Sequence, residues 1–249
     1  MPIFKIQHAN AHILYDAERF CGSAVPLDAP ARVEALFDTS FWEAREGIVA
    51  SAPGRGESLF VAPHELSATS DAEWVLRHYR RGGAIAHVAS KRYAWTGVER
   101  TRAFREMRLT AGLKERGLAV PAPVGACVWR HQLSYEAAFI SVRIPGARPL
   151  ASLLNEIDTT VLEQVGRLIR DAHDLGLDHV DLNARNILID HKGKAFIIDL
   201  DRCRLRDQGR WQEANLARLG RSLEKFAPGN APSLLETITR SYHETTSPR

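Results

Sequence analysis

The sequence predicts an α+β fold of two lobes, with a β-rich first lobe and a reduced, mostly helical second lobe. Short apolar runs with β-branched residues, bounded by glycine and proline, fill the segment 45–146. In the segment 147–249 most apolar residues recur at helical spacing, and a single strand pair interrupts them. We therefore expect one domain with an N-lobe at 45–146 and a C-lobe at 147–249, preceded by an N-terminal extension at 1–44.

The first strands are predicted at two apolar runs, 47–50 and 58–62, which flank a glycine-rich turn. A third strand is expected at 73–79. The segment before them, 1–44, mixes short apolar groups with prolines and follows no clear period. The structure of this segment therefore stays open, and we treat it as an extension of the N-lobe.

A helix is predicted between Gly97 and Gly117, because the apolar residues of 104–113 follow a roughly helical spacing. Arg116-Gly117, with a proline just beyond, is a typical helix stop. Two strands, at 124–129 and 137–142, complete the N-lobe.

The C-lobe is expected to begin with a helix that Asp158 caps and that ends just before Gly176. A hairpin follows, because two short apolar runs flank the turn His191-Lys-Gly-Lys. Two further helices are predicted at 210–226 and 232–242.

Composition is that of an ordinary folded protein, with 249 residues, 45% of them hydrophobic and 25% charged. The start of the chain lacks the apolar core of a signal peptide, and no run approaches the ~18 apolar residues that span a bilayer. The three cysteines lie far apart, which favours a reducing compartment over a disulfide framework.

Net charge is only +3, but the segment 77–116 carries eleven Lys and Arg against three Glu. Such a stretch attracts anions, and a phosphate-rich partner or an anionic membrane surface would fit it. A solvated helix face is the alternative. A nucleic-acid partner is not expected, because few aromatic residues are interleaved with the basic ones.

The most informative motif is His179-Val-Asp-Leu-Asn-Ala-Arg-Asn186, followed by the hairpin and Asp199. It matches the catalytic loop of protein kinases, H-R-D-L-x-x-x-N, at His, Asp, Leu and Asn, and the metal-binding Asp of that pattern also follows a strand pair. The alternative is that these are ordinary polar residues at strand ends.

Phosphoryl transfer requires these residue types, because hard oxygen ligands must hold Mg²⁺ while another carboxylate orients the attacking hydroxyl. Asp181 would be that catalytic carboxylate. Asn186 and Asp199 would be the metal ligands, and His179 would support the loop. A zinc site built on His173, His179 and Asp181 is disfavoured, because these residues lack the i, i+4 spacing of a helical zinc pair.

The N-lobe supplies candidate ATP-binding residues in the order that kinases use. Arg77 lies in the third strand and Glu106 in the following helix, as the phosphate-binding cation and its carboxylate partner would. Lys91 is an alternative cation. Gly54 and Gly56 form the candidate phosphate cradle, although the third glycine of G-x-G-x-x-G is missing and a plain tight turn fits equally well.

Seven segments carry a resemblance to a known family, and together they cover most of the chain from about residue 45 to 226. They are Trp74–Gly83, Tyr93–Gly97, Phe104–Arg108, Arg143–Arg148, His179–Asn186, Ile198–Arg202 and Trp211–Leu216. With them the sequence resembles the lipopolysaccharide core kinases of the protein-kinase-like superfamily, and most closely those acting on 3-deoxy-D-manno-octulosonic acid (Kdo).

The resemblance implies a protein-kinase-like bilobal fold and transfer of the γ-phosphate of ATP, with Mg²⁺, to a Kdo sugar. The acceptor would be a Kdo-lipid A precursor, with the 4-hydroxyl as the expected site. The resemblance also implies a peripheral enzyme on the cytoplasmic side of a bacterial inner membrane, and an anionic membrane surface would suit the basic stretch.

Several residues depart from the protein-kinase pattern. Val180 replaces the Arg that pairs with a phosphorylated activation loop, Leu200-Asp201 replaces Phe-Gly, and Asn183 stands where many protein-serine kinases have Lys. These departures favour a sugar or another small acceptor over a peptide. Kinases for a core heptose, a small molecule or a protein remain alternatives, as does a catalytically dead binding module, because Arg77 replaces the usual Lys.

Overall fold

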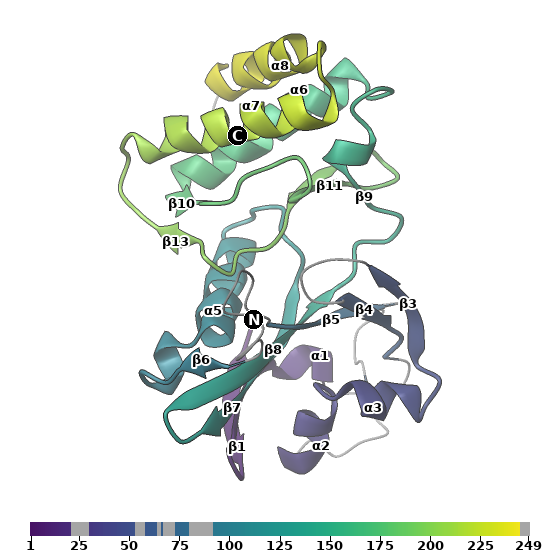
Figure 1. Ribbon diagram of the computed structural model, residues 1–249, viewed down its shortest axis with the longest axis vertical. Coiled ribbons are helices and arrows are strands. Elements are labelled where there is room, and N and C mark those ends of the chain that lie inside the picture. Colours follow the sequence, from purple (N-terminus) through teal and green to yellow (C-terminus); the bar gives the residue numbers. More distant parts are fainter. Residues whose placement is uncertain (21–29, 53–57, 64–65, 67–72, 80–91, 245–249) are drawn as a thin grey trace. The chain divides into compact units, whose positions relative to one another are not determined.

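The computed structural model describes residues 1–20, 30–52, 58–63, 66, 73–79 and 92–244 (Figure 1). The chain forms two compact units. The first unit consists of residues 1–111 and 122–143, and the second of residues 112–121 and 144–249. Strands joined by hairpins in the first unit and long helices in the second make this a mixed α+β fold of the protein-kinase-like class, as the sequence predicts. The predicted lobe boundaries stay a prediction.

An antiparallel sheet forms the framework of the first unit, and its described strands are hydrogen-bonded in the order β1-β2-β7-β8-β5-β4-β3, with β6 on β8. The strands are β1 (Ile3–His8), β2 (Ala11–Asp16), β3 (Ile48–Ala52), β4 (Ser58–Val61), β5 (Trp74–His78), β6 (Tyr93–Ala94), β7 (Pro123–His131) and β8 (Ser134–Val142). All five strands predicted for the N-lobe are confirmed, as β3, β4, β5, β7 and β8.

Residues 1–44, which the sequence predicts as an extension, contribute strands and helices to this unit. Strand β2 pairs with β7, so that Ile13 lies opposite Cys127, and β1 pairs with β2. The helices here are α1 (Ala17–Phe20), α2 (Pro30–Ala35) and α3 (Thr39–Glu43). Strand β2 packs apolar side chains against both faces of the sheet, and so it lacks the alternation that marks a half-buried strand.

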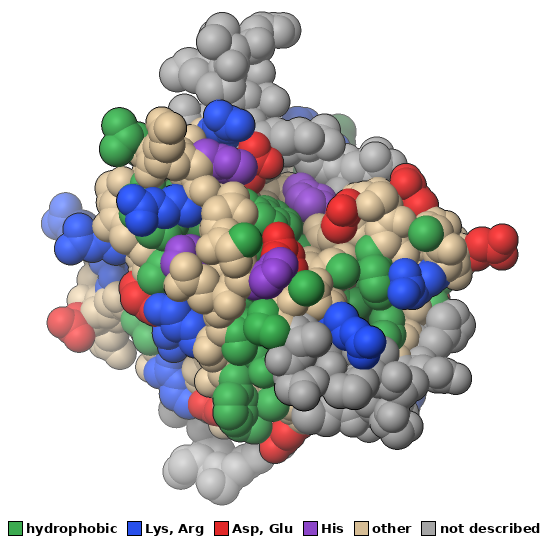
Figure 2. Space-filling model, turned by 90° about the horizontal axis from the view of Figure 1, so that it is seen from below, with side chains coloured by type: hydrophobic (Ala, Val, Ile, Leu, Met, Phe, Trp, Pro, Cys, Tyr) green, Lys and Arg blue, Asp and Glu red, His purple; other side chains and the backbone are tan. Residues whose placement is uncertain are grey.

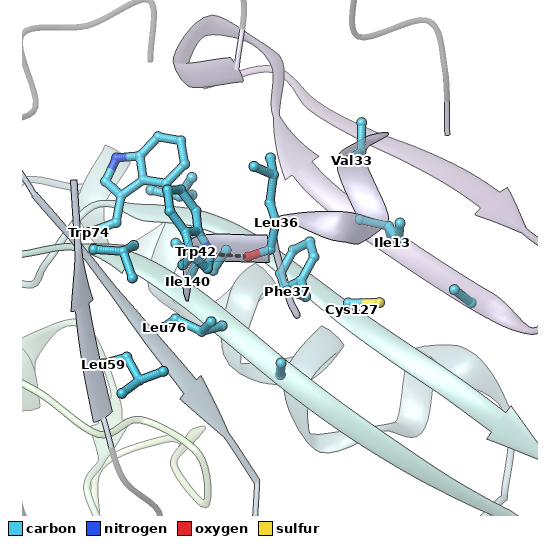
Figure 3. Packing of buried hydrophobic residues seen from close by; sticks show 14 residues of the cluster. Ile13, Val33, Leu36, Phe37, Trp42, Leu59, Trp74, Leu76, Cys127 and Ile140 are labelled. Carbon is cyan, nitrogen blue, oxygen red and sulfur yellow. Dashed lines mark hydrogen bonds between the residues drawn. The ribbon is translucent and has the colours of Figure 1, made fainter. Parts of the chain in front are cut away.

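One face of the sheet is covered by α2, α3 and the turn between them (Figure 3). The indole of Trp42 packs edge to face against that of Trp74, with 6.3 Å between ring centroids, and its Nε1 donates to the carbonyl of Leu36 at 2.8 Å. Both indoles are buried. The N-terminal segment therefore completes the hydrophobic core of the first unit.

The other face is covered by α5 (Arg102–Glu115), which follows the 3-10 turn η2 (Val98–Arg100). Phe104 and Met107 on this helix are fully buried among residues of β7 and β8, such as Phe139. Gly117, with φ of +87°, takes the left-handed conformation that ends such helices. The predicted helix and its stop are confirmed, and the helix carries Glu106 to the inner side of the sheet.

The second unit contains the helices α6 (Thr159–Asp174), α7 (Trp211–Phe226) and α8 (Ala231–His243). Its short strands are β9 (Arg148–Pro149), β10 (Leu177–Asp178), β11 (Ile187–Ile189), β12 (Ala195–Ile197) and β13 (Arg204–Leu205), and the 3-10 turn η3 (Leu150–Ser152) follows β9. The sheets are β12-β11-β9 and β10-β13. The Asp158 cap, the hairpin at 186–199 and both later helices are confirmed.

Helices α6 and α8 pack closely because Gly166 has no side chain. A Cβ atom there would lie 2.0 Å from the Ser241 hydroxyl and 2.3 Å from the Ile238 carbonyl oxygen. Among the described residues, no helix has the length and apolarity to cross a bilayer.

Candidate active site

The loop His179–Asn186 connects β10 to β11 in the second unit, and a buried histidine supports it. The Nε2 of His179 donates to the carbonyl oxygen of Ile198 at 3.0 Å. Burial lowers the pKa of His179, so the imidazole is neutral at pH 7 and supplies one N–H for this bond. His179 therefore fixes the start of the loop to the segment that follows β12, in the supporting position that the sequence predicts.

Asp181 presents its carboxylate at the surface, while side chains of the same loop hold its backbone. Its carbonyl oxygen accepts hydrogen bonds from Asn183 Nδ2 at 2.7 Å and from Asn186 Nδ2 at 3.0 Å. Its Oδ1 accepts one from the guanidinium of Arg218, on α7, at 3.0 Å. The carboxylate is 58% exposed. An accessible carboxylate on an immobilised backbone suits a group that orients a substrate hydroxyl.

Asn186 and Asp199 lie at the open end of the β11–β12 hairpin. The amide N–H of Ile198 donates to the carbonyl oxygen of Asn186 at 3.0 Å, which places the residues preceding β11 and following β12 side by side. Asp199 has φ of +62°, a left-handed conformation that aspartate tolerates better than most residues.

The two side chains fit a hard cation. Because Nδ2 of Asn186 is engaged by the loop, Oδ1 is the amide atom available as a ligand, and exposed Asp199 adds carboxylate oxygens. These are the ligands that Mg²⁺ prefers. Within the described part of the chain, no three His, Cys, Asp or Glu side chains are grouped as metal ligands.

A buried carboxylate directly before the loop is a feature that the sequence analysis missed. Asp178 accepts hydrogen bonds from Asn215 Nδ2 at 3.1 Å, from Arg206 at 3.1 Å and from Arg204 at 3.3 Å. Burial raises the pKa of the Asp178 carboxyl, but these three donors outweigh it and hold the pKa below its usual value. The start of the loop is therefore fixed by an ionised carboxylate.

In the first unit, the structure brings Arg77 and Glu106 together as the sequence order suggested. The guanidinium of Arg77, on β5, reaches both oxygens of Glu106, on α5, at 2.6 and 2.7 Å. The Glu106 side chain is 3% exposed and that of Arg77 25%. The Arg77 side chain is therefore partly exposed, while the carboxylate that it contacts is enclosed.

Tyr79 is a third member of this cluster, and sequence reasoning did not find it. Its hydroxyl donates to Glu106, and the guanidinium of Arg77 lies 4.9 Å from its ring centroid. Burial and the adjacent Glu106 carboxylate raise the pKa of Tyr79 well above its usual value, so the phenol keeps its proton. The available signal was its place two residues after Arg77 in the strand predicted at 73–79, since residues i and i+2 lie on one face of a strand.

The remaining candidates, Gly54 and Gly56 of the glycine-rich turn and the alternative cation Lys91, lie outside the described residues. The described site residues form two groups, and all members of a group belong to the same unit. Arg77, Tyr79 and Glu106 form the first group, and His179, Asp181, Asn186 and Asp199 lie in the second unit.

Similarity to known proteins shows the family of this chain. Residues 39–242 match the family model "Lipopolysaccharide kinase (Kdo/WaaP) family". A protein of Vibrio cholerae named 3-deoxy-D-manno-octulosonic acid kinase is 42% identical over 187 residues, which cover 74% of this chain and 77% of that protein.

Proteins of the same name show similar coverage in other organisms. One from Xylella fastidiosa strain 9a5c is 42% identical over 88% of this chain and 82% of its own length, and one from Mannheimia succiniciproducens is 36% identical over 90% of both. The resemblance stated from the motifs is confirmed. The chain belongs to the lipopolysaccharide kinase (Kdo/WaaP) family and is a phosphotransferase that acts on an alcohol group.

Proposed function

We propose that this protein transfers the γ-phosphate of ATP to the 4-hydroxyl of a Kdo sugar on a Kdo-lipid A precursor. The family and the name shared by relatives from three genera support Kdo as the acceptor and ATP as the donor. The single observation that carries the chemistry is the loop of the second unit, where an exposed Asp181 carboxylate projects from a backbone fixed by Asn183 and Asn186.

In the proposed reaction, Asp181 orients the acceptor hydroxyl and takes its proton. The hydroxyl oxygen forms a bond to the γ-phosphorus as the bond from that phosphorus to the bridging oxygen breaks, and ADP leaves with the bonding electrons. Asn186 and Asp199 would hold Mg²⁺, which when bound neutralises charge on the phosphates.

We assign binding of the ATP phosphates to Arg77, held in place by Glu106. The enclosed Glu106 carboxylate engages the guanidinium, and the hydroxyl of Tyr79, two residues after Arg77 in the chain, donates to the same carboxylate. Arginine binds phosphate as a planar fork, and a buried carboxylate that holds the guanidinium fixes the direction in which this fork points. The Gly54–Gly56 turn is the proposed cradle for the same phosphates.

We further propose peripheral binding at the cytoplasmic side of a bacterial inner membrane, on an anionic lipid surface. Lys and Arg side chains gather toward one side of the face shown in Figure 2. Lys5, Arg92 and Arg108 are each about half exposed, although each also contacts a glutamate. Leu133, at the tip of the β7–β8 hairpin, is 85% exposed and is an apolar group that such a surface could take up.

The test is mass spectrometry of a Kdo-bearing lipid A precursor after incubation with the purified protein, ATP and Mg²⁺, beside the variant Asp181→Asn. We expect a gain of one phosphate on the sugar with the wild type and at least ~10³-fold less with the variant. Fragment ions then identify the hydroxyl. If phosphate were found only on a heptose-containing core, the acceptor would be that heptose and not Kdo. If Asp181→Asn were as active as the wild type, Asp181 would not be the catalytic carboxylate.

A further inference from the structure

One face of α7 contacts the catalytic loop and the residue before it through three side chains, three and four residues apart. The contacts are Asn215 Nδ2 to Asp178 Oδ1 at 3.1 Å, Arg218 to Asp181 Oδ1 at 3.0 Å, and the amide N–H of Ala184 to Ser222 Oγ at 3.0 Å. The three α7 residues are spaced i, i+3 and i+7, which places them in one row on the helix. A single helix therefore contacts the segment 178–184 at three points.

The middle contact reaches the proposed catalytic group itself. Arg218 NH1 lies 3.0 Å from Asp181 Oδ1, and the two side chains are 46% and 58% exposed. Asn183, at the position where many protein-serine kinases have a lysine, donates instead to the backbone carbonyl of Asp181. The cation next to the Asp181 carboxylate thus comes from α7 rather than from the loop.

A carboxylate has two oxygens, and the contact makes them inequivalent. Oδ1 of Asp181 accepts a charge-assisted hydrogen bond from Arg218, and such a bond fixes both the rotation of the carboxylate plane and the position of Oδ2. Proton transfer from an acceptor hydroxyl requires an oxygen held within hydrogen-bond reach in a fixed direction. Oδ2 is the atom that this arrangement leaves for that purpose.

We propose that Arg218 is a positioning residue, which orients the Asp181 carboxylate so that Oδ2 receives the proton of the acceptor hydroxyl. This inference rests on the proposed role of Asp181. Since both side chains are largely exposed, their contact adds little to the stability of the fold, and a variant of Arg218 is expected to fold normally.

The experiment compares Arg218→Gln with Arg218→Lys and with a matched control, Arg221→Gln, which removes the same charge one turn further along the exposed side of α7. Steady-state kinetics with ATP, Mg²⁺ and the Kdo-bearing precursor give kcat and the KM for both substrates. We expect Arg218→Gln to lower kcat about 10-fold with both KM values within about twofold of wild type. Arg218→Lys should recover most of the loss, and Arg221→Gln should match the wild type.

Three results would overturn the proposal: a kcat of Arg218→Gln equal to that of Arg221→Gln, an effect confined to the KM of the acceptor, or a loss that Lys does not rescue and that accompanies a lower melting temperature. The first shows no role, the second a role in binding and the third a structural role. Asp181→Asn, assayed in parallel, separates this proposal from the function itself. Full activity of Asp181→Asn refutes the catalytic assignment, whereas an inactive Asp181→Asn beside a fully active Arg218→Gln refutes only the positioning role.

Discussion

The Arg77–Glu106 pair of the first unit and the Arg218–Asp181 pair of the second join the same chemical groups, at 2.6 and 3.0 Å, but differ in burial. Glu106 is enclosed and also binds Tyr79, so its partners depend on it for their orientation. Asp181 and Arg218 are both open to solvent, and the backbone of Asp181 is held by other bonds. The difference predicts that the first pair contributes to the stability of the fold, whereas the exposed second pair contributes little to it.

The largest loss of stability is expected from Glu106→Ala. This change leaves the buried Tyr79 hydroxyl without this acceptor and Arg77 without its enclosed counter-charge. Breaking such a pair should lower the free energy of unfolding by about 4 kcal/mol. Urea unfolding followed by tryptophan fluorescence measures it. Glu115→Ala, at the exposed end of the same helix, is the control. If the free energy of unfolding fell by less than about 1 kcal/mol, burial would not make the Arg77–Glu106 pair more important for stability than the exposed Arg218–Asp181 pair.

The effect of burial on stability in the second unit can be tested through pH at His173, a buried histidine on α6. Burial lowers the pKa of His173 to about 4, so the folded state keeps the imidazole neutral while the unfolded chain protonates it below pH 6.5. Stability is therefore complete above pH 6.5 and falls as the pH drops toward 4, by about 3 kcal/mol.

The measurement is the free energy of unfolding between pH 7 and pH 4 for the wild type and His173→Phe. We expect a flatter profile for the variant, because it retains the contribution of buried His179 but loses that of His173. Parallel profiles would show that His173 is accessible to protons in the folded state.

A smaller loss of stability is expected for Asp178→Asn. This change removes a buried carboxylate from the second unit and can be compared with the removal of Glu106 from the first. Asn215, Arg204 and Arg206 would each lose a charged acceptor, at a cost of about 2 kcal/mol. The pKa of Asp178 is lower in the folded protein than in the unfolded chain, so its ionised carboxylate stabilises the fold at pH values above the pKa of the unfolded chain. The wild type should lose this stabilisation as the pH falls through the pKa that Asp178 has in the folded protein. Asp174→Asn, at an exposed pair with Arg170, is the matched control.

The smallest effect on stability is expected for Asp181→Asn, the change that should abolish activity. Its exposed pair with Arg218 contributes at most about 0.5 kcal/mol, so thermal unfolding should be nearly that of the wild type. If the variant were markedly less stable, Asp181 would share the structural role of Glu106 and the contrast between the two pairs would disappear.

The sequence alone was sufficient for the elements with a strong local signal. The strands that became β3, β4 and β5, the capped helix α6 and the hairpin at 186–199 all combine a clear apolar pattern with a recognisable turn or cap. The contact between Arg77 and Glu106 also agrees with their predicted order on a strand and the next helix.

The parts that could not be predicted depend on contacts between distant residues. Strand β2 has apolar side chains on both faces because β7 and the helices around it enclose it, and no local pattern reveals that enclosure. Asn215 and Arg218 read as ordinary polar residues of a helix surface. Their roles arise because α7 packs beside a loop more than thirty residues earlier in the chain.

The row formed by Asn215, Arg218 and Ser222 has a consequence for changes in chain length. The three contacts come from one continuous helix, so their positions relative to one another depend on the number of residues between them in α7. One residue inserted within α7 between Asn215 and Arg218 would rotate everything after it by ~100° and translate it by ~1.5 Å, which separates Arg218 and Ser222 from the loop while Asn215 stays in place. If Arg218 positions Asp181 as proposed, such an insertion should lower activity even where the rest of the helix still folds.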